Sequence, residues 1–437
     1  MKILSITAQK PTGTGSGFFL TELVRALDGC GHQQMVVGGV YPEDEIALPD
    51  GVPFRPVFFC QTPSLAGAAI PDAVTPDAVT PDAVIPYPIV GMSDEMPYKS
   101  TRYRDMTPAM VSQFERAFMA VIRRAVEDFD PDVIFCHHLY LLTAMVREAF
   151  PDRRVCGFCH NTDLRQMKKH ALEKERIRRG IASLDRIFVL RRDQIAEVEA
   201  IYGADPDRMT PVGMGYNSAV FNRQPALRDM NGRSSHATRS SHTSVRLIFA
   251  GKISEKKGVM SLIRSLSYLP EFSGNTGSPS GSGVTLTCAG GAGNEDEYRE
   301  ILSLAEKAPC PVTFTGRLDQ TALAALYNQS DIFVLPSFSE GLPLTVIEAL
   351  ACGCRVVVSD LPGVRDWLDE FVRGGDIRYV TLPALVNTDE AVPEELPAFE
   401  RRLAEAIADS IRADSSCADV SALTWERLAS LVLETLR

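Results

Sequence analysis

The sequence of 437 residues has no apolar run close to the roughly 20 residues that a helix needs to cross a bilayer. Its first residues, MKILSITAQK, lack the apolar core and the cleavage site of a secretory signal peptide. Basic residues are in the minority, with 45 Lys and Arg against 56 Asp and Glu, which gives a net charge of −11. This balance argues against a general nucleic-acid binder. We expect a cytoplasmic protein whose contact with membranes is at most peripheral.

Disulfide spacing is also absent, although the chain has ten cysteines. Most of them lie in apolar, strand-like surroundings, which predicts reduced and buried thiols. The segment 156–160 has the C-x-x-C-H pattern of c-type haem attachment, but it has the character of a buried strand in a chain without an export signal. A zinc or redox site is a second alternative, and it would use Cys136, His137, His138, Cys159 and His160.

The spacing within this pattern disfavours both alternatives. Cys156 and Cys159 are three positions apart, so on a strand their side chains would point to opposite faces of the sheet. No second C-x-x-C pair accompanies them. We therefore predict that no metal is bound here.

The chain repeats a strand, a loop and a helix from its first residue, which predicts an α/β protein with parallel sheets. Its length predicts two domains. After the first strand, a glycine-rich loop at 11–17 leads into a helix predicted from about Phe18 to Asp28. Five strands are predicted in the first series, at 1–7, 35–40, 133–136, 155–159 and 187–190. Five more are predicted in the second, at 246–250, 284–289, 312–315, 332–336 and 355–359.

These two series predict one domain at 1–220 and another at 245–421. Between them, 226–244 is rich in Ser, Arg, Asn and His and is expected to be a flexible insertion. At 71–85 the repeat PDAVT places a proline at every fifth position, which prevents a helix interior and predicts a lengthened surface loop. The last segment, 422–437, has apolar residues at helical spacing and could pack back on the first domain as a brace.

The strongest chemical signal is the segment SFSEGLPLTVIE at 337–348, with a helix stop at Gly353. It predicts a helix entered from a parallel strand, with Pro343 in its first turn, and the free N–H groups of such a helix N-terminus bind diphosphate. Glu348 would lie about five residues into the helix, roughly 7–8 Å along the axis. A carboxylate there can accept two hydrogen bonds from a ribose diol, whereas Glu340, on the turn, could face a sugar.

Two lysines follow another strand of the same domain, in GKISEKKG at 251–258. Lys252 and Lys257 could neutralise a leaving diphosphate, which is a role that a divalent metal has in some sugar transferases. From this segment alone, a solvated lysine turn is an equal alternative.

Together these residues resemble the retaining glycosyltransferases of family 4, whose GT-B fold consists of two facing Rossmann-like domains. The E-x7-E motif of that family corresponds to Glu340 and Glu348, and its G-R-L-x-x-x-K-G loop corresponds to 251–258, with Lys252 in place of arginine. The resemblance also covers the N-terminal glycine loop, His160, the turn at 213–221 and the W-E-R helix at Trp425.

The resemblance implies transfer of a hexose-type sugar from a nucleoside-diphosphate donor, such as a UDP-sugar, to a hydroxyl acceptor. The anomeric configuration would be retained, and no metal or other cofactor would be needed. In the family's front-side displacement the donor phosphate takes the acceptor proton, so no protein nucleophile is required. Catalytic roles are implied for Glu340, His160, Lys252 and Lys257, with His160 touching the transferred sugar. Donor-binding roles are implied for Gly15, Gly17, Lys252, Lys257, Arg317, Glu340, Gly341, Leu342, Pro343, Leu344 and Glu348.

The basic segment 165–179 (RQMKKHALEKERIRR) allows two interpretations. It could be a solvated helix with i,i+4 ion pairs, or a helix that binds a phosphate or carboxylate on the acceptor. For the whole chain, a sugar-nucleotide-binding module without catalysis and a sugar-nucleotide epimerase are alternatives. The presence of both glutamates and both lysines favours the transferase.

Overall fold

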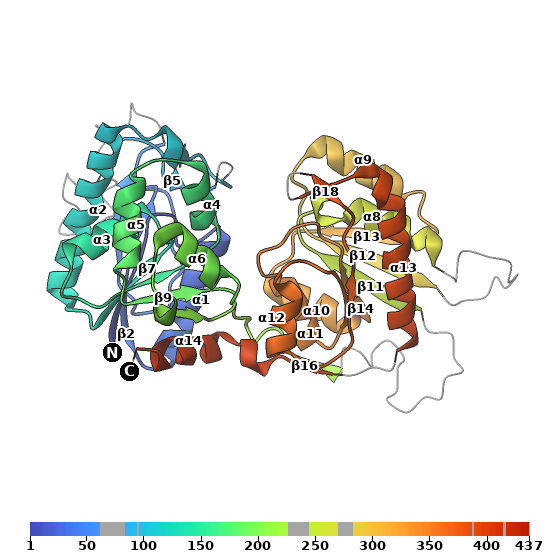
Figure 1. Ribbon diagram of the computed structural model, residues 1–437. Helices are drawn as coiled ribbons and strands as arrows, with labels where there is room; N and C mark the ends of the chain where they lie inside the picture. The colour runs from blue at the N-terminus through green and yellow to red at the C-terminus, as the bar shows by residue number, and fades with distance from the viewer. Residues whose placement is uncertain are drawn as a thin grey trace, which may run out of the picture. The chain divides into compact units, whose positions relative to one another are not determined.

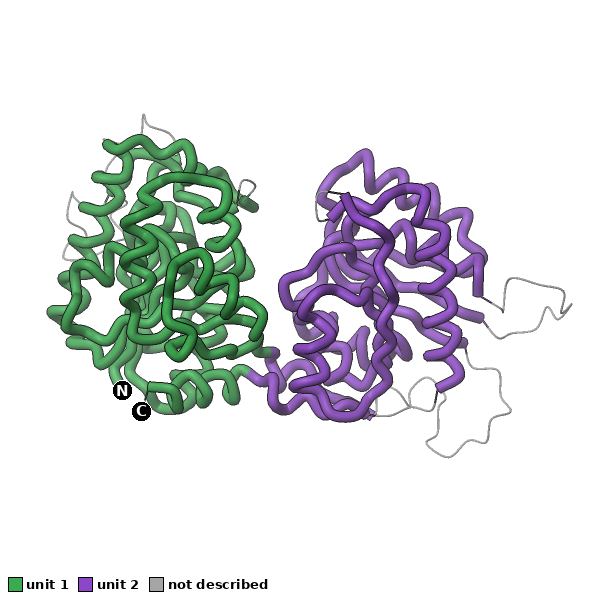
Figure 2. The backbone as a smooth tube through the Cα atoms, viewed as in Figure 1, with its two compact units in different colours: residues 1–215, 425–437 green, residues 216–424 purple. Residues whose placement is uncertain are grey.

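The computed structural model describes residues 1–61, 84–93, 96–225, 244–269, 283–386, 389–413 and 417–436. The chain divides into two compact units, one of residues 1–215 and 425–437 and one of residues 216–424 (Figure 2). Most of the predicted loop at 71–85 and nearly all of the insertion at 226–244 lie outside the described residues.

Unit 1 is built on an eight-stranded parallel sheet with the strand order β10-β9-β8-β7-β1-β2-β3-β4 (Figure 1). All five strands predicted for the first series are present. The strands are β1 (Lys2–Thr7), β2 (Gln33–Val40), β3 (Phe54–Phe59), β4 (Val84–Ile85), β7 (Val133–His137), β8 (Val155–Phe158), β9 (Arg186–Val189) and β10 (Met209–Pro211). A small separate pair, β5 (Val90–Gly91) and β6 (Thr101–Arg102), lies outside this sheet.

Helices cover both faces of the sheet of unit 1, so its central strands are apolar throughout. On one face, α1 (Gly15–Gly29) and α14 (Trp425–Glu434) lie side by side (Figure 1) and share a core with β7 and β8. Trp425 packs so closely there that a Cβ atom at Gly215 would lie 2.4 Å from its ring. The other face carries α2 (Pro108–Phe129), α3 (Leu141–Ala149), α4 (Thr162–Lys169), α5 (Lys174–Ala182) and α6 (Gln194–Tyr202).

Helix α1 begins three residues before the predicted start. The prediction of Phe18 was wrong because Thr14 caps the helix: its side-chain oxygen accepts a hydrogen bond from the N–H of Gly17 at 3.0 Å. A glycine run therefore forms the first helical turn instead of a loop.

The basic segment 165–179 forms parts of two helices, α4 and α5, so the interpretation as one solvated helix with i,i+4 ion pairs was wrong, while binding of an acceptor anion stays a prediction. Glu173, between them, has a left-handed backbone (φ 47°) that interrupts the helix. Arg176 of this segment forms ion pairs with residues of other helices, Glu115 and Glu148, both at 2.7 Å. These contacts attach α5 to α2 and α3.

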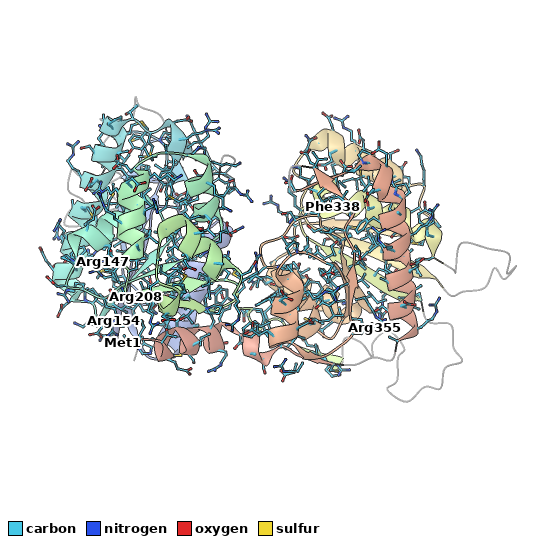
Figure 3. The ribbon with its side chains drawn as sticks, in the orientation of Figure 1. Met1, Arg147, Arg154, Arg208, Phe338 and Arg355 are labelled. Carbon is cyan, nitrogen blue, oxygen red and sulfur yellow. The ribbon has the colours of Figure 1, made fainter. Side chains whose placement is uncertain are left out.

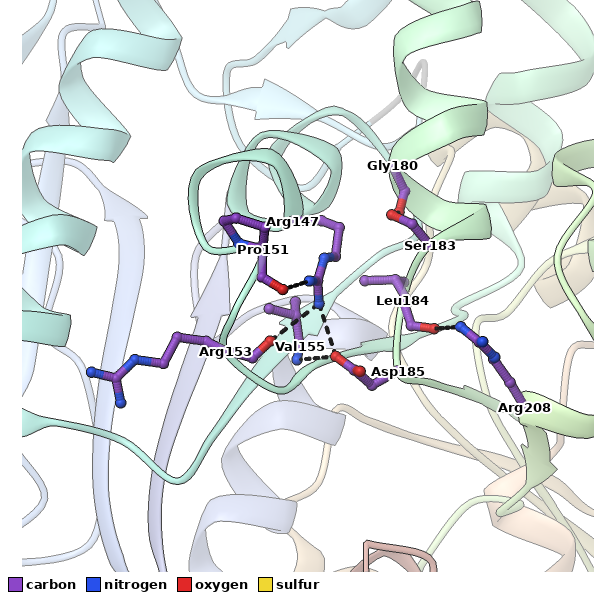
Figure 4. Close-up of polar contacts among 9 residues, drawn as sticks. All are labelled: Arg147, Pro151, Arg153, Val155, Gly180, Ser183, Leu184, Asp185 and Arg208. Carbon is purple, nitrogen blue, oxygen red and sulfur yellow. Dashed lines mark hydrogen bonds and ion pairs between the residues drawn. The ribbon is translucent and has the colours of Figure 1, made fainter.

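Polar contacts also fix the amino edge of the unit 1 sheet (Figure 4). Asp185 accepts hydrogen bonds from the backbone N–H of Val155 and from the guanidinium of Arg147, both at 2.8 Å. Arg147 also donates to the carbonyl of Arg153 at 3.1 Å. These charged groups join the loops at this edge of the sheet.

Unit 2 contains a six-stranded parallel sheet with the order β13-β12-β11-β14-β15-β17. The five strands predicted for the second series are present: β11 (Val245–Ala250), β12 (Val284–Ala289), β13 (Val312–Gly316), β14 (Ile332–Leu335) and β15 (Arg355–Ser359); β17 (Ile377–Val380) is additional. The helices are α8 (Val259–Ser265), α9 (Glu295–Ala305), α10 (Gln320–Gln329), α11 (Leu344–Ala351), α12 (Val364–Phe371) and α13 (Leu396–Arg412).

Two short antiparallel pairs complete unit 2, namely β16 (Arg373–Gly374) with β20 (Ala418–Asp419) and β18 (Leu385–Val386) with β19 (Glu390–Ala391). The predicted fold class, α/β with parallel sheets in two domains, is confirmed. No helix in the described part of the chain has both the length and the hydrophobicity of a membrane span.

Candidate functional site

Three loops at the carboxyl edge of the unit 2 sheet meet through their backbones, because their strands, β12, β11 and β14, are neighbours. A Cβ atom at Gly258 would lie 2.0 Å from the carbonyl oxygen of Pro336, and one at Gly290 would lie 1.7 Å from that of Gly251. Both glycines also have positive φ angles, 73° and 148°. Glycine at these two positions therefore allows the loops after β11, β12 and β14 to touch.

Two cations lie over the glycine-rich loop that follows β12. A Cβ atom at Gly293 would lie 1.9 Å from Cε of Lys252, and one at Gly291 would lie 2.6 Å from Nε of Arg317. Both cations are exposed, and neither has an ion pair with any described residue. Cations that no carboxylate neutralises, held above small residues, form a place where an anion can bind.

The other predicted lysine, Lys257, pairs with the predicted catalytic carboxylate Glu340, with Nζ and Oε1 at 2.7 Å. Its ammonium group also donates to the carbonyl of Ser339 at 3.3 Å. The neighbouring Lys256 instead contacts Asp389 at 3.0 Å and Glu390 at 3.4 Å. The side chains of the two adjacent lysines thus reach different parts of unit 2, and of the two only the ammonium group of Lys257 contacts the loop of Glu340.

The loop between β14 and α11 is anchored by Phe338, which is labelled in Figure 3. The ring of Phe338 is buried against Phe399, with ring centroids 5.6 Å apart, and its N–H donates to the carbonyl of Lys256 at 3.0 Å. Pro343 is the residue before the helix instead of part of its first turn, because its ψ of 91° is extended. Helix α11 therefore begins at Leu344, one residue after the predicted position, and Gly341 and Leu342 precede it.

Glu348 lies in α11 as predicted and is almost completely buried, with 8% of its surface exposed. Its carboxyl group has no hydrogen bond or ion pair with any described residue. Burial raises the pKa of Glu348 to about 7. A buried carboxyl group without a protein partner is costly, which is typical of a group that a ligand completes.

In unit 1, the loops after β7 and β8 are joined by Asp163, which is fully buried. Its carboxylate accepts hydrogen bonds from the backbone N–H groups of Leu139 at 2.8 Å, His160 at 3.2 Å and Leu164 at 3.1 Å. Burial raises the pKa of Asp163, and these three donors oppose the rise. Asp163 therefore determines where the backbone of His160 lies.

Three histidines gather at this edge. The rings of His137 and His160 are nearly parallel, with centroids 5.5 Å apart, and the ring of His138 is 4.8 Å from that of His160. The ring of Phe19 meets the ring of His160 edge-on at 5.1 Å. Burial lowers the pKa of His160 to about 3 and the pKa values of His137 and His138 well below their ordinary range. All three rings are therefore neutral at pH 7.

The predicted state of the cysteines is confirmed, since all ten are free thiols and eight are buried. Cys156 contacts the core of the α1 face, whereas Cys159 contacts the core of the opposite face, as the strand geometry predicted. Among the described residues, no group of three or more His, Cys, Asp and Glu side chains could hold a metal ion. That finding gives no support to the zinc alternative at Cys136, His137, His138, Cys159 and His160. The independence of the reaction from metal remains a prediction.

The predicted glycines of the first loop lie at the start of α1. Gly15 is its first residue, and a Cβ atom at Gly17 would lie 2.8 Å from the carbonyl oxygen of Lys10. In the basic segment, Arg165, Lys169 and Lys174 are exposed and have no ion pair with any described residue. These three charges are available to an anionic ligand or to solvent.

Sequence reasoning missed Asp163 and the glycines Gly291 and Gly293. A signal for Asp163 was present, because an acidic residue three positions after His160 stands at the start of a helix, where it can accept backbone hydrogen bonds. For the glycines, the pattern G-G-x-G directly after a buried strand indicates close backbone approach to a ligand or side chain.

Two family descriptions match the chain. Residues 96–219 match Glycosyltransferase Family 4, and residues 233–376 match Glycosyl transferases group 1. The family that the motifs predicted is therefore confirmed. The first match falls in unit 1 except for its last four residues, and the second covers the loops of Lys252, Lys257 and Glu340.

Curated relatives include two proteins named D-inositol 3-phosphate glycosyltransferase. The one from Xylanimonas cellulosilytica is 29% identical over 199 residues, 44% of this chain and 45% of the relative. The one from Mycobacterium ulcerans is 29% identical over 281 residues, 60% of this chain and 57% of the relative. The chain thus spans about half the length of the curated relatives it matches.

Solved structures with the same fold include sucrose-phosphate synthase from Thermosynechococcus elongatus, with a TM-score of 0.61 and 16% identity over 100% of this chain and 98% of that one. Anabaena Alr3699/HepE in complex with UDP and glucose has a TM-score of 0.55 and 14% identity over 100% and 99% of the two chains. These similarities establish the GT-B fold.

Proposed function

Because residues 96–219 belong to Glycosyltransferase Family 4 and residues 233–376 to the glycosyl transferases group 1, we propose that this protein transfers a sugar from a nucleoside-diphosphate donor to a hydroxyl acceptor. The observation that carries the proposal is the unpaired, buried Glu348 in a helix whose preceding loop holds the Lys257–Glu340 pair. A ribose diol would satisfy Glu348, a diphosphate would bind at the N-terminus of α11 near Lys257, and the donor sugar would contact Glu340.

In the proposed reaction, Lys252, Lys257 and Arg317 stabilise the negative charge that develops on the leaving nucleoside diphosphate. Because these cations supply the charge, we propose that no metal ion is required. Glu340 would contact the donor sugar, and His160 of unit 1 would contact the sugar that is transferred. The acceptor hydroxyl bonds to the anomeric carbon on the face from which the diphosphate leaves and gives its proton to the donor phosphate, so the anomeric configuration is retained.

We propose a phosphorylated polyol as the acceptor class. The two curated relatives carry inositol 3-phosphate in their names, and this chain offers exposed cations on α4 and α5, Arg165, Lys169 and Lys174, that could bind a phosphate.

The proposal predicts that one nucleotide-sugar among a panel raises the melting temperature of the protein and is slowly hydrolysed by it. A ligand at about 100 times its Kd stabilises the folded state by about 2.7 kcal/mol. Differential scanning fluorimetry identifies the donor, and release of the nucleoside diphosphate measures turnover. Stabilisation without any turnover, with or without sugar phosphates as acceptors, would identify a binding module, and interconversion of the sugar at its ring carbons would identify an epimerase.

The same assay tests the metal and the stereochemistry. Activity is expected to persist in EDTA, and proton NMR of the first product is expected to show the donor's anomeric configuration. Activity that EDTA abolishes and magnesium or manganese restores would contradict the role given to the cations. An inverted product would contradict retention.

Glu348→Gln is expected to weaken donor binding and to stabilise the empty protein at high pH. Loss of hydrogen bonds from a charged acceptor costs about 1.5–3 kcal/mol of binding free energy. In the empty protein, the pKa of Glu348 is raised from 4.5 to about 7, so its folded state holds the proton more tightly than the unfolded state. The parent therefore loses stability as pH rises from 4.5 through 7, by about 3 kcal/mol in total, and the glutamine variant escapes this loss.

Calorimetric melting at pH 5 and pH 8, with donor titrations at both, measures the two effects. The gain in melting temperature should appear at pH 8 and be small at pH 5, and the parent's donor affinity should rise with pH through 7. The matched control is Glu405→Gln on the exposed face of α13, which should change neither quantity. Unchanged donor affinity in Glu348→Gln would remove the ribose role.

A further inference from the structure

His137 forms the one side-chain hydrogen bond that the ring of His160 makes in the described part of the chain. Nδ1 of His137 and Nε2 of His160 are 3.3 Å apart. His137 is the last residue of β7, and its partner in register, Phe158, is the last residue of the neighbouring parallel strand β8. His160 follows Phe158 by two residues. The contact is therefore set by the register of the sheet.

The ring of His137 is itself held firmly. Only 4% of the residue is exposed, and its ring stacks on that of Phe158 with an interplanar angle of 9° and a centroid distance of 5.0 Å. Its second nitrogen, Nε2, is buried without any hydrogen-bond partner. A rigid, buried imidazole whose one hydrogen bond is made to a neighbouring ring restricts the orientation of that ring.

A hydrogen bond between two neutral imidazoles requires one proton between them. If His137 carries the proton on Nδ1, His160 must carry its own on Nδ1. If His160 carries its proton on Nε2, its Nδ1 is bare, and His137 is protonated on Nε2. The protonation patterns of the two rings are therefore coupled.

We propose that His137 is a positioning residue for His160. His137 holds the ring of His160 in place and fixes which nitrogen of that ring carries the proton. It thereby decides whether Nδ1 of His160 donates a hydrogen bond to the sugar or accepts one from it. His160 is partly exposed, and its Nδ1 makes no hydrogen bond with the described residues, so this nitrogen is the one left for a substrate. The inference rests on the proposed function, in which His160 contacts the transferred sugar.

Nitrogen-15 NMR of histidine-labelled protein tests the coupling without any activity measurement. The signals of the two rings are assigned with His137→Asn and His160→Ala. In the parent, we expect one of the two facing nitrogens, Nδ1 of His137 and Nε2 of His160, to be protonated and the other bare. Two bare or two protonated facing nitrogens would overturn the proposal, whether or not a donor has been found.

His137→Phe keeps a stacking ring but removes the hydrogen bond, and it is expected to lower kcat about 5- to 10-fold with little change in the donor KM. His137→Asn should recover much of this loss, because an amide can either donate or accept. In His137→Phe, the NMR signals of His160 should show a mixture of tautomers. The far-ultraviolet circular dichroism spectrum verifies that each variant is folded.

His138→Asn is the matched control. The ring of His138 is equally buried and close to His160, but its two nitrogens have no hydrogen-bond partner, and asparagine suits its left-handed φ of 75°. Its kcat should stay within about twofold of the parent. An inactive parent would defeat the proposed function, whereas an active parent with a fully active His137→Phe and an unchanged His160 tautomer would defeat only the role of His137.

Discussion

Lys257→Met is expected to lower turnover by about 10²- to 10³-fold, the usual effect of removing one group that stabilises the charge of a transition state. In unit 2, Lys257 is the lysine bound to Glu340, at 2.7 Å, and only 28% of its side chain is exposed. Its loss would leave the carboxylate of Glu340 unpaired where the diphosphate departs. The variant would therefore lose the attraction between Lys257 and the diphosphate and gain a repulsion between the diphosphate and Glu340.

The neighbouring lysine provides the control. Lys256→Met removes the same charge one residue away, but that charge contacts Asp389 and Glu390, and 53% of the side chain is exposed. We expect less than a threefold change in turnover, because exposed ion pairs contribute little. Steady-state release of nucleoside diphosphate compares the two variants. Equal losses in both would show that the loop needs positive charge in general and not the Lys257–Glu340 pair.

Gly258→Ala is expected to lower the free energy of unfolding of unit 2 by about 3 kcal/mol or more. The positive φ of 73° costs a side chain about 1–2 kcal/mol. In addition, the new Cβ atom would lie 2.0 Å from the carbonyl oxygen of Pro336, a contact that requires the backbone to move. The loops of Lys257 and Glu340 would separate, so donor binding should fall together with stability.

Gly316→Ala distinguishes the two causes. Gly316 has nearly the same φ, 71°, but nothing lies within 4 Å of its Cβ position. It should therefore cost only the backbone term of about 1–2 kcal/mol. Urea unfolding of both variants, followed by circular dichroism, measures the difference. Similar losses in the two variants would show that the loops yield easily and that their backbone contact adds no stability.

Most of the sheet could be predicted from the sequence, because strands buried on both faces carry continuous apolar runs. Strands β4, β10 and β17 escaped prediction because they lie at the sheet edges, where β10 ends in Pro211 and β17 carries Arg378. Strand β3 contains Pro56, which argues against a strand in sequence reasoning. Helix boundaries were missed where a single side-chain cap, Thr14, or a single left-handed residue, Glu173, decided them.

In the candidate site, the sequence identified residue types and spacing but not partners. The family loop points to Lys257 in GKISEKKG, but the different partners of Lys256 and Lys257 depend on where β18 and β19 lie relative to β14. In the same way, His137 and His138 are adjacent, yet the register of β7 with β8 gives only one of them a bond to His160. The partner of each side chain is set by the tertiary structure, and the local sequence pattern does not predict it.

The position of α14 has a consequence for synthesis of the protein on the ribosome. Trp425, which packs against Gly215 and α1 in unit 1, is translated only after the whole of unit 2. At about 5–20 residues per second, the roughly 210 residues of unit 2 delay this helix by about 10–40 s. During that time α14 is absent from the face of α1 that it covers in the folded unit, so unit 1 completes its core only after Trp425 leaves the ribosomal tunnel.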